Sequence, residues 1–455
     1  MSTQHPSLLA LEQEAAAEGR AYGRERLRER LQQIAEQQGS ISPRSSLRLK
    51  DACFRDLPLE TTLGRLTIRA HYGYDPHSQR WMFPVKELWG LAAHQEVSPY
   101  LEQLVSYTAT ECGSYQKAQQ MAASWGVSIS ATSIHKHVQH LGAKAQQQEQ
   151  IRARRALDAA TRPEVARQAQ AQAPNALQEY SLVISMDAWK ARERGPDWGL
   201  KPPEAPGQRI EWKDLKLAVI YRLDQLVEKA PPQTDPTAKP RRQILQKFWV
   251  ASPSDTPPEE FGRLVHAEAL RRGMAQAQYV FLVSDGALWI WNIVADRFVG
   301  ALNELDFYHA SQHLWAVAHD LYPQAQAARS WVEPLLHQLR HGQEAEVLGT
   351  LEKLPEHVRT LGGAVSELLE REIKYFTTHR DHIHYQDNAA KGFPVGSGAI
   401  ESACSQFQNR FKRTGQFWKS ESLGHLQSLK VARQDGDWEE LSQLSSPIPA
   451  SLACP

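Results

Sequence analysis

Three acidic residues stand where folding would bring carboxylates to one place. Asp187 ends the apolar run SLVISM and Asp285 ends the run YVFLVS, so each is expected where a buried strand reaches the edge of a sheet. Glu401 stands near the start of a predicted helix within Gly396–Trp418. Carboxylate oxygens are hard ligands that suit Mg²⁺ or Mn²⁺. Two such ions, about 4 Å apart, activate an attacking water or hydroxyl and stabilise the leaving oxygen in phosphodiester chemistry.

The formal charges that follow Glu401 in this stretch are all positive, whereas a solvated helix normally mixes signs. A basic helix beside a metal-binding carboxylate predicts contact with a phosphate backbone. The residues expected to make it are Arg410, Lys412, Arg413 and Lys419. Because the formal net charge of the chain is +0, any nucleic-acid-binding surface must be local.

A second candidate DNA contact lies in the N-terminal half. The stretch SYQKAQQMAASWGVSISATSIHKHVQHLG predicts a helix, a turn at Gly126 and a second helix that begins at 130–132. Its apolar positions are spaced to pack the two helices together: Ala118, Met121, Ala122, Val127, Ile134 and Val138. The second helix would present Ser133, Lys136, His137 and His140 to a groove of DNA. An ordinary helical hairpin fits the same pattern.

Length and composition indicate a protein of the reducing cytosol. The 455 residues are enough for two or three domains. The four cysteines form no CxxC pair, which argues against a zinc finger or a disulfide framework. No apolar run reaches the length of a membrane span, and the N-terminus lacks the pattern of a signal peptide. We therefore expect a cytoplasmic protein that makes no contact with a membrane.

Changes in composition and in hydrophobic periodicity along the chain predict its domains. The expected order is an N-terminal helix (1–45), a small β-rich module with a hairpin turn near 75–78 (46–95), the helix-turn-helix-like region (96–142), an Ala/Gln/Arg-rich, partly helical linker (143–178), a mixed α/β core (179–308), a nearly all-helical block (309–392), the final helix of the core (393–435) and a tail (436–455). Within the core, three consecutive strands, a helix and a further strand are the order of a ribonuclease H-like fold, by analogy at the level of the fold. A fifth strand is expected near 298–305.

The chain resembles a DDE transposase of a bacterial insertion sequence, in the Mutator-like superfamily and closest to its Kra group. The resemblance covers about 180–433 and rests on the segments SMDAW, VSDGALWIW, NELDFYHASQHLW and GSGAIESACSQFQNRFKRTGQFW. It implies a ribonuclease H-like α/β catalytic domain interrupted by an all-helical insertion and preceded by DNA-binding modules. Likeness to the family is looser in the N-terminal half.

Site roles follow from the same resemblance, residue by residue. It implies that Asp187, Asp285 and Glu401 bind two Mg²⁺ or Mn²⁺ ions, with Asp306 and His309 as accessory active-site residues. The implied activity is cleavage of transposon ends and strand transfer into target DNA. The implied partners are double-stranded terminal repeats and target DNA, bound by a homodimer or a higher oligomer that joins the bacterial nucleoid.

Other interpretations stay open. The family's β-rich module often carries a cysteine pair that suggests a zinc ribbon, but 67–84 has none. A catalytically silent, transposase-derived DNA-binding regulator would keep the fold without the chemistry, and a glycoside hydrolase would use two of the carboxylates beside an aromatic sugar cleft. Weaker candidates are zinc at the histidines of 309–313 or 379–384, a base-stacking role for a tryptophan otherwise expected in the core, and Ser397 as a nucleophile.

Overall fold

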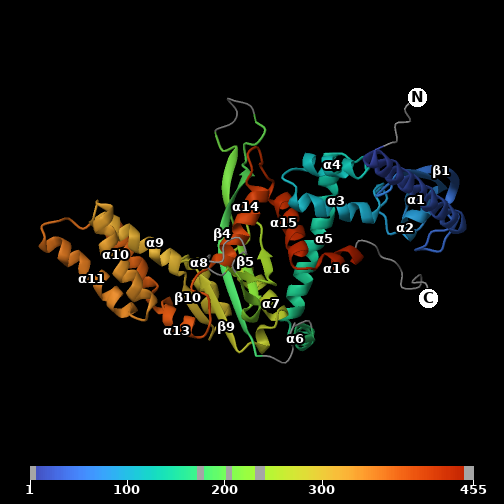
Figure 1. Cartoon of the computed structure of the whole chain (residues 1–455). Helices are drawn as coiled ribbons and strands as arrows, with labels where there is room; N and C mark the ends of the chain where they lie inside the picture. Colours follow the sequence, from blue (N-terminus) through green and yellow to red (C-terminus); the bar gives the residue numbers. More distant parts are fainter. Residues whose placement is uncertain (1–6, 172–178, 201–206, 231–240, 445–455) are drawn as a thin grey trace. The chain divides into compact units, whose positions relative to one another are not determined.

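The computed structural model of the chain describes residues 7–171, 179–200, 207–230 and 241–444 (Figure 1). It forms two compact units. One combines Met1–Gln148 with Ser422–Pro455, and the other is Glu149–Glu421. The predicted N-terminal segment, linker and tail reach beyond the described residues at 1–6, 172–178 and 445–455.

The first unit begins with a helix on a small sheet. The expected N-terminal helix is present as α1 (Leu8–Gln38), and β1 (Lys50–Thr61), β2 (Gly64–Asp75) and β3 (Arg80–Met82) form an antiparallel sheet. Leucines of β1 and β2 form a core with Ala35 of α1. The predicted turn after β2 is also present, because the Asp75 carboxylate accepts the N–H groups of His77 and Ser78.

The other described helices of the first unit are α2 (Pro84–Leu88), α3 (Pro99–Glu111), α4 (Tyr115–Ser124), α5 (Ala131–Leu157), α15 (Ser420–Gln434) and α16 (Trp438–Leu444). Helix α5 continues into the second unit from Glu149. The predicted helix, turn and helix are confirmed as α4, Gly126 at φ +81° and α5. Of the apolar residues expected between the two helices, all are buried except Met121, which is 46% exposed. The tertiary grouping of α15 differs from the predicted boundaries, which place 393–435 in the α/β core.

The predicted linker is packed where it is described. Helix α5 continues to Leu157, and α6 (Arg162–Ala171) follows. In the second unit, Ala153, Ala156 and Val165 are buried against Ala267 and Leu270 of α7 (Pro258–Arg271). Small side chains let these helices approach closely, so the Ala-rich segment is part of a packed core and does not act only as a linker.

The second unit is built on a mixed sheet. In the described part of the chain, five strands lie in the order β10-β9-β4-β5-β8. Their bounds are β4 (Ser181–Arg194), β5 (Ile210–Arg222), β8 (Phe248–Ala251), β9 (Tyr279–Ser284) and β10 (Leu302–Leu305). Strands β4, β5 and β8 are antiparallel neighbours, whereas β9 and β10 run parallel to β4. The predicted third strand, 244–252, forms only in part: β8 covers its second half, whereas Ile244 ends β7 (Arg241–Ile244), which pairs separately with β6 (Leu226–Lys229).

Alternation along β4 sends side chains to two covered faces. Leu182, Ile184 and Met186 share a core with α7 and with α8 (Leu288–Arg297). On the other face, Trp189 packs on phenylalanines of α14 (Gly398–Phe411). Asp187 shares the second face, because residues two apart on a strand point the same way.

The predicted helical block is confirmed as α9 (Phe307–Leu321), α10 (Ala325–Arg340), α11 (Glu344–Thr360), α12 (Glu367–Thr378) and α13 (Tyr385–Ala390). Its buried residues and those of the sheet form one continuous hydrophobic core, so the block is anchored to the strands. Among the described residues, none of the helices combines the length and the apolar composition needed to cross a bilayer.

Candidate functional site

Three aspartates stand level with one another where the parallel strands end. Continuing the β4–β9 register places Asp187 opposite Asp285, and continuing the β9–β10 register places Asp306 beside Asp285. Ser284, the last residue of β9, holds the strands together at this level. Its hydroxyl accepts the Met186 N–H at 3.0 Å, and its carbonyl accepts the Asp306 N–H at 2.8 Å.

Helix α14 brings a fourth carboxylate to this edge. Ser397 donates both its backbone N–H and its hydroxyl (2.6 Å) to Asp306 Oδ2, which fixes the start of the helix. The Ser397 hydroxyl also lies 3.4 Å from Oε1 of Glu401, in the first turn. The carboxylate oxygens of Asp306 and Glu401 and a ring nitrogen of His309 all lie within 4.8 Å of one another.

The loop before α14 must be narrow to reach this position. A Cβ at Gly396 would lie 2.7 Å from the ring of Tyr308 and 3.4 Å from Asp306 Oδ2. The carbonyl of Val395 accepts the N–H of Phe307 at 3.0 Å, so the loop lies directly on the first turn of α9. Gly396, the first glycine of the GSG segment, is therefore required here, because a side chain at this position would overlap the ring of Tyr308.

Asp187 also contacts α14. The Cys404 thiol donates to Asp187 Oδ2 at 3.5 Å, and Cys404 lies on the same face of the helix as Glu401. Burial raises the pKa of Asp187 and the charge of Asp285 raises it further, although the N–H of Ala188 opposes both. Burial and the surrounding carboxylates raise the pKa of the Cys404 thiol strongly, which keeps it protonated as a donor.

The helical block contributes a tyrosine that the sequence did not single out. The Tyr375 ring covers Gly286, where a Cβ would lie 2.8 Å from both Cζ and Oη. Its hydroxyl is buried and has no hydrogen-bond partner among the described residues. Burial, and then the charges of Asp285 and Asp306, raise the Tyr375 pKa. The glycine directly after Asp285 was the available sequence signal, but its partner is distant in the chain.

His313 lies beneath this tyrosine and is not grouped with His309 at a metal. Its ring stacks on Tyr375, with centroids 3.7 Å apart, and its Nδ1 hydrogen-bonds the buried carboxylate of Glu372. The structure thus gives His313 a positioning contact, whereas His309 faces Asp306 and Glu401.

The histidines of 379–384 and several tryptophans contribute to the packing of the second unit. His382 stacks on Trp291 at 4.0 Å and bonds Asn303 Oδ1 at 2.6 Å, while burial lowers the pKa of His379 and of His382. Trp291 belongs to the core, and Trp289, Trp315 and Trp331 pack against it. Among the described residues, the potential metal-ligand group is Asp306, His309 and Glu401, and 379–384 forms none.

The basic residues after Glu401 divide into one buried and three exposed. Lys412, Arg413 and Lys419 are exposed. Arg410 differs from the expectation: it is 3% exposed, with its guanidinium beside the rings of Phe411 and Trp418. It is the inward-facing position of an amphipathic helix, so a surface contact with DNA is not available to it in this conformation.

The residues predicted to face a DNA groove divide similarly. Lys136 is exposed and Ser133 is half-buried. The His137 side chain is 14% exposed and its Nδ1 donates to Glu102 Oε1 at 2.8 Å; His140 donates to the same oxygen at 2.9 Å. Glu102 is buried, and despite that burial these imidazoles lower its pKa to about 2. His137 therefore satisfies a buried carboxylate, which the helical periodicity did not reveal.

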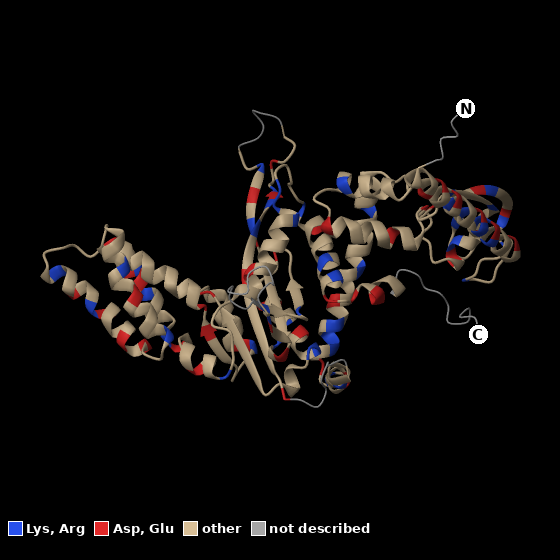
Figure 2. Cartoon of the chain, in the orientation of Figure 1, with Lys and Arg blue, Asp and Glu red and all other residues tan. Residues whose placement is uncertain are grey.

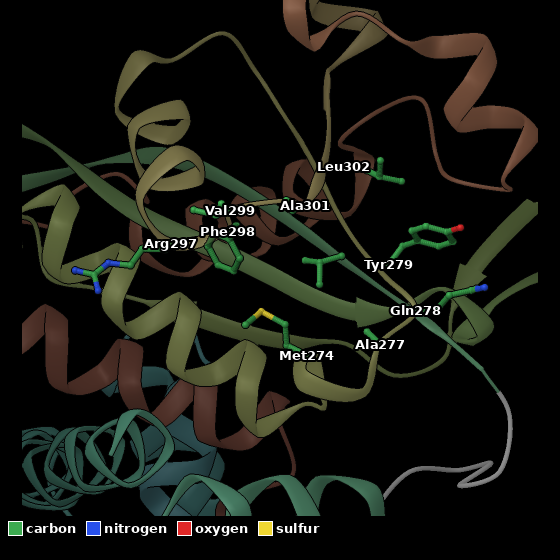
Figure 3. A pocket seen from close by; sticks show the side chains of 11 residues that line it. Met274, Ala277, Gln278, Tyr279, Arg297, Phe298, Val299, Ala301 and Leu302 are labelled. Atoms are coloured by element: carbon green, nitrogen blue, oxygen red, sulfur yellow. The ribbon is translucent and has the colours of Figure 1, made fainter. Parts of the chain in front are cut away.

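A pocket of about 380 Å³ lies at the opposite end of the strands (Figure 3). Tyr279 and Leu302 line it, and these are the first residues of β9 and β10. The carboxylates gather where the same strands end. The pocket is therefore separate from the acidic site.

Comparison with known proteins covers only the N-terminal third. Residues 7–160 match the model of an uncharacterised protein family, UPF0236. The match ends before β4, so it contains none of the acidic residues at the sheet edge. No curated protein matches the chain.

Proposed function

We propose that the chain is a DDE-type DNA transposase that cuts the ends of a transposable element and joins them to target DNA. The observation that carries the proposal is that Asp187, Asp285 and Glu401 all lie near the Cys404 thiol of α14, which donates to Asp187 and whose pKa is raised by burial and by the three charges. Asp187 lies on β4, Asp285 directly follows the parallel strand β9, and Glu401 lies in the first turn of α14, whose N-cap Ser397 binds Asp306.

The sheet supports a ribonuclease H-like assignment for the second unit. In this sheet the antiparallel strands β4, β5 and β8 come first, with the separate β6–β7 pair between β5 and β8; α7 follows, and then β9 and β10, which run parallel to β4. In this scheme α9–α13 are the insertion and α14 returns to the core. The assignment rests on topology, and the chemistry rests on the acids.

The donor set fits hard divalent cations. Two Mg²⁺ or Mn²⁺ ions would be held by Asp187, Asp285 and Glu401, and they would supply activation of the attacking hydroxyl and stabilisation of the leaving oxygen. The raised pKa of Asp187 reflects burial and the nearby charge of Asp285, and a cation between the two carboxylates would relieve that repulsion.

Asp306 is better suited to positioning than to metal binding. Its Oδ2 already accepts two bonds from Ser397, and its Oδ1 accepts the N–H of His309 at 2.8 Å. These bonds start α9 and hold α14. The His309 imidazole is left free to donate to a non-bridging phosphate oxygen as negative charge builds in the transition state.

The partners would be double-stranded transposon ends and target DNA, bound by a dimer or higher oligomer. Lys136 in the first unit and Lys412, Arg413 and Lys419 in the second offer exposed cations for the backbone. The alternative is a DNA-binding regulator that has kept this fold without activity.

One assay decides between them. The full-length protein is incubated with DNA that carries both flanks of its own coding sequence, with and without Mg²⁺. We expect metal-dependent nicks at the element ends and joined products. Specific binding of these ends by a protein that never cuts them under any divalent cation would favour the regulator.

A further inference from the structure

Strands β4 and β5 continue beyond the rest of their sheet. Strand β9 pairs only with residues 181–184 of β4, and β8 only with residues 217–220 of β5. Residues 188–194 and 210–216 therefore extend as a two-stranded ribbon, which projects from the sheet in Figure 1. We call these two segments the ribbon. The backbone of Trp418 also pairs with the β4 edge of the ribbon, at Arg192 and Arg194.

The two faces of the ribbon differ. On the inner face, Trp189 is buried against Phe407 and Phe411 of α14. On the outer face, Arg192 pairs across the strands with Trp212. Trp212 is 54% exposed, so the ribbon leaves a large indole surface in water although it buries a tryptophan on its inner face.

Cations surround this indole. Arg192 Cζ lies 5.7 Å and Lys412 Nζ 5.3 Å from the Trp212 ring, and Arg192 also lies 5.1 Å from the Phe417 ring. The guanidinium of Arg192 donates to the carbonyl of Arg413, which fixes its position. Figure 2 shows basic residues, with acidic ones among them, along the projecting part of the ribbon.

A second pair of an arginine and an exposed tryptophan lies two residues further along β4. Arg194 lies 5.0 Å from the ring of Trp198, which is 40% exposed, and its Nε donates to the Phe417 carbonyl at 3.2 Å. Exposed aromatic rings among fixed cations are the composition of surfaces that bind single-stranded nucleic acid, because bases stack on the rings while phosphates meet the cations.

We propose that Trp212, Arg192 and Lys412 form a stacking platform for unpaired DNA beside the bond to be cut. The inference rests on the proposed transposase function and deepens it. Arg192 lies five residues beyond Asp187 on β4, a span of about 16 Å, or about five nucleotides at the stacked spacing of ~3.4 Å. In a duplex the base faces are covered by their neighbours, so the exposed indole favours a strand that has been opened.

The test is binding without cleavage, in EDTA. A forked DNA with an unpaired arm of about five nucleotides carries 2-aminopurine in that arm, and a fully paired DNA of the same sequence is the comparison. Stacking on the indole quenches 2-aminopurine. We expect quenching and tighter binding of the fork by the full-length protein, and in Trp212→Ala a loss of quenching with an affinity for the fork at least roughly 5-fold weaker.

Three matched variants sharpen the test. Trp212→Phe keeps a ring and should retain most of the affinity for the fork. Ile210→Ala removes a 42%-exposed apolar side chain from the same strand and should change nothing. Lys412→Gln should reduce the slope of log affinity against log salt by about one.

Distinct outcomes overturn distinct claims. If Trp212→Ala binds the fork as tightly as wild type, or loses fork and duplex equally, the platform is wrong. A Trp212→Ala protein that changes oligomeric state in solution would make the ribbon an interface between copies. A wild-type protein that binds neither DNA would overturn the transposase proposal as well, whereas metal-dependent cutting with no effect at Trp212 would overturn the platform alone.

Discussion

Ser397 donates two hydrogen bonds to Asp306 Oδ2, across a separation of 91 residues. This contact joins the end of β10 to the start of α14 and closes the helical block between them. Because Glu401 lies in the first turn of α14, its carboxylate is positioned by an aspartate that is itself buried and accepts three hydrogen bonds. The acidic site is thus held where the chain enters the helical block and where it leaves it.

The first prediction concerns the three proposed metal ligands. Asp187→Asn, Asp285→Asn and Glu401→Gln should each abolish cleavage and joining, because each removes a charged oxygen ligand with little change of shape. Binding of the element ends, measured by gel shift, should stay largely intact. A variant that still cuts at a near wild-type rate would remove that residue from the site.

The second prediction concerns His309. If its imidazole donates to the phosphate, His309→Ala should lower the cleavage rate by roughly 10²-fold, with melting temperature and end affinity nearly unchanged. The backbone N–H that binds Asp306 is kept in this variant. His384→Ala, at an exposed histidine, is the control. Early melting with normal cutting by the folded fraction would assign His309 to the scaffold.

The third prediction tests the contact between Gly286 and Tyr375. Gly286→Ala should lower stability by about 1–3 kcal/mol, because the new methyl group would overlap the tyrosine ring. Adding Tyr375→Leu should recover much of the melting temperature. Gly349→Ala meets no atom within 4 Å and should not destabilise. Equal melting of Gly286→Ala and wild type would show that the ring does not hold this position.

The fourth prediction is a pH dependence at Glu304. Burial raises the pKa of this carboxyl to about 8 from 4.5, although the hydrogen bond from Asn388 Nδ2 at 2.5 Å acts to lower it. The folded chain then holds a proton that the unfolded chain releases, so stability falls as pH rises from 4.5 towards 8. Glu304→Gln should melt higher than wild type at pH 8, by about 2 °C or more, and equally at pH 4.5. An identical pH profile for the two proteins would contradict this.

The fifth prediction concerns the first unit. A fragment that ends near Gln170 lacks α15 and α16, although Gly142 lies directly on His425 and Lys430 Nζ is 3.0 Å from Glu111. We expect this fragment to fold poorly and a fusion that adds residues 422–444 to fold and bind element ends. Cooperative melting of the short fragment by itself would show that the C-terminal helices are dispensable.

The sequence determined the elements and the candidate acids, because both are local patterns. The apolar runs before Asp187 and Asp285 predicted β4 and β9, and the small residues before Glu401 predicted the start of α14. Helical periodicity correctly placed α1, α4 and α5, and it predicted the helical block. The proposed chemistry follows from residue types in those positions, and it stays a prediction.

Only the tertiary structure decided which side chains meet. Arg410 and His137 were predicted to reach DNA, but they turn inward because a helix face is chosen by what packs on it, and Glu102 that receives His137 lies on another helix. The contact of Tyr375 with Gly286 and the grouping of α15 with the N-terminal unit likewise join residues distant in the chain. Periodicity reports which face of one element is apolar, whereas the identity of the partner depends on contacts that no local pattern encodes.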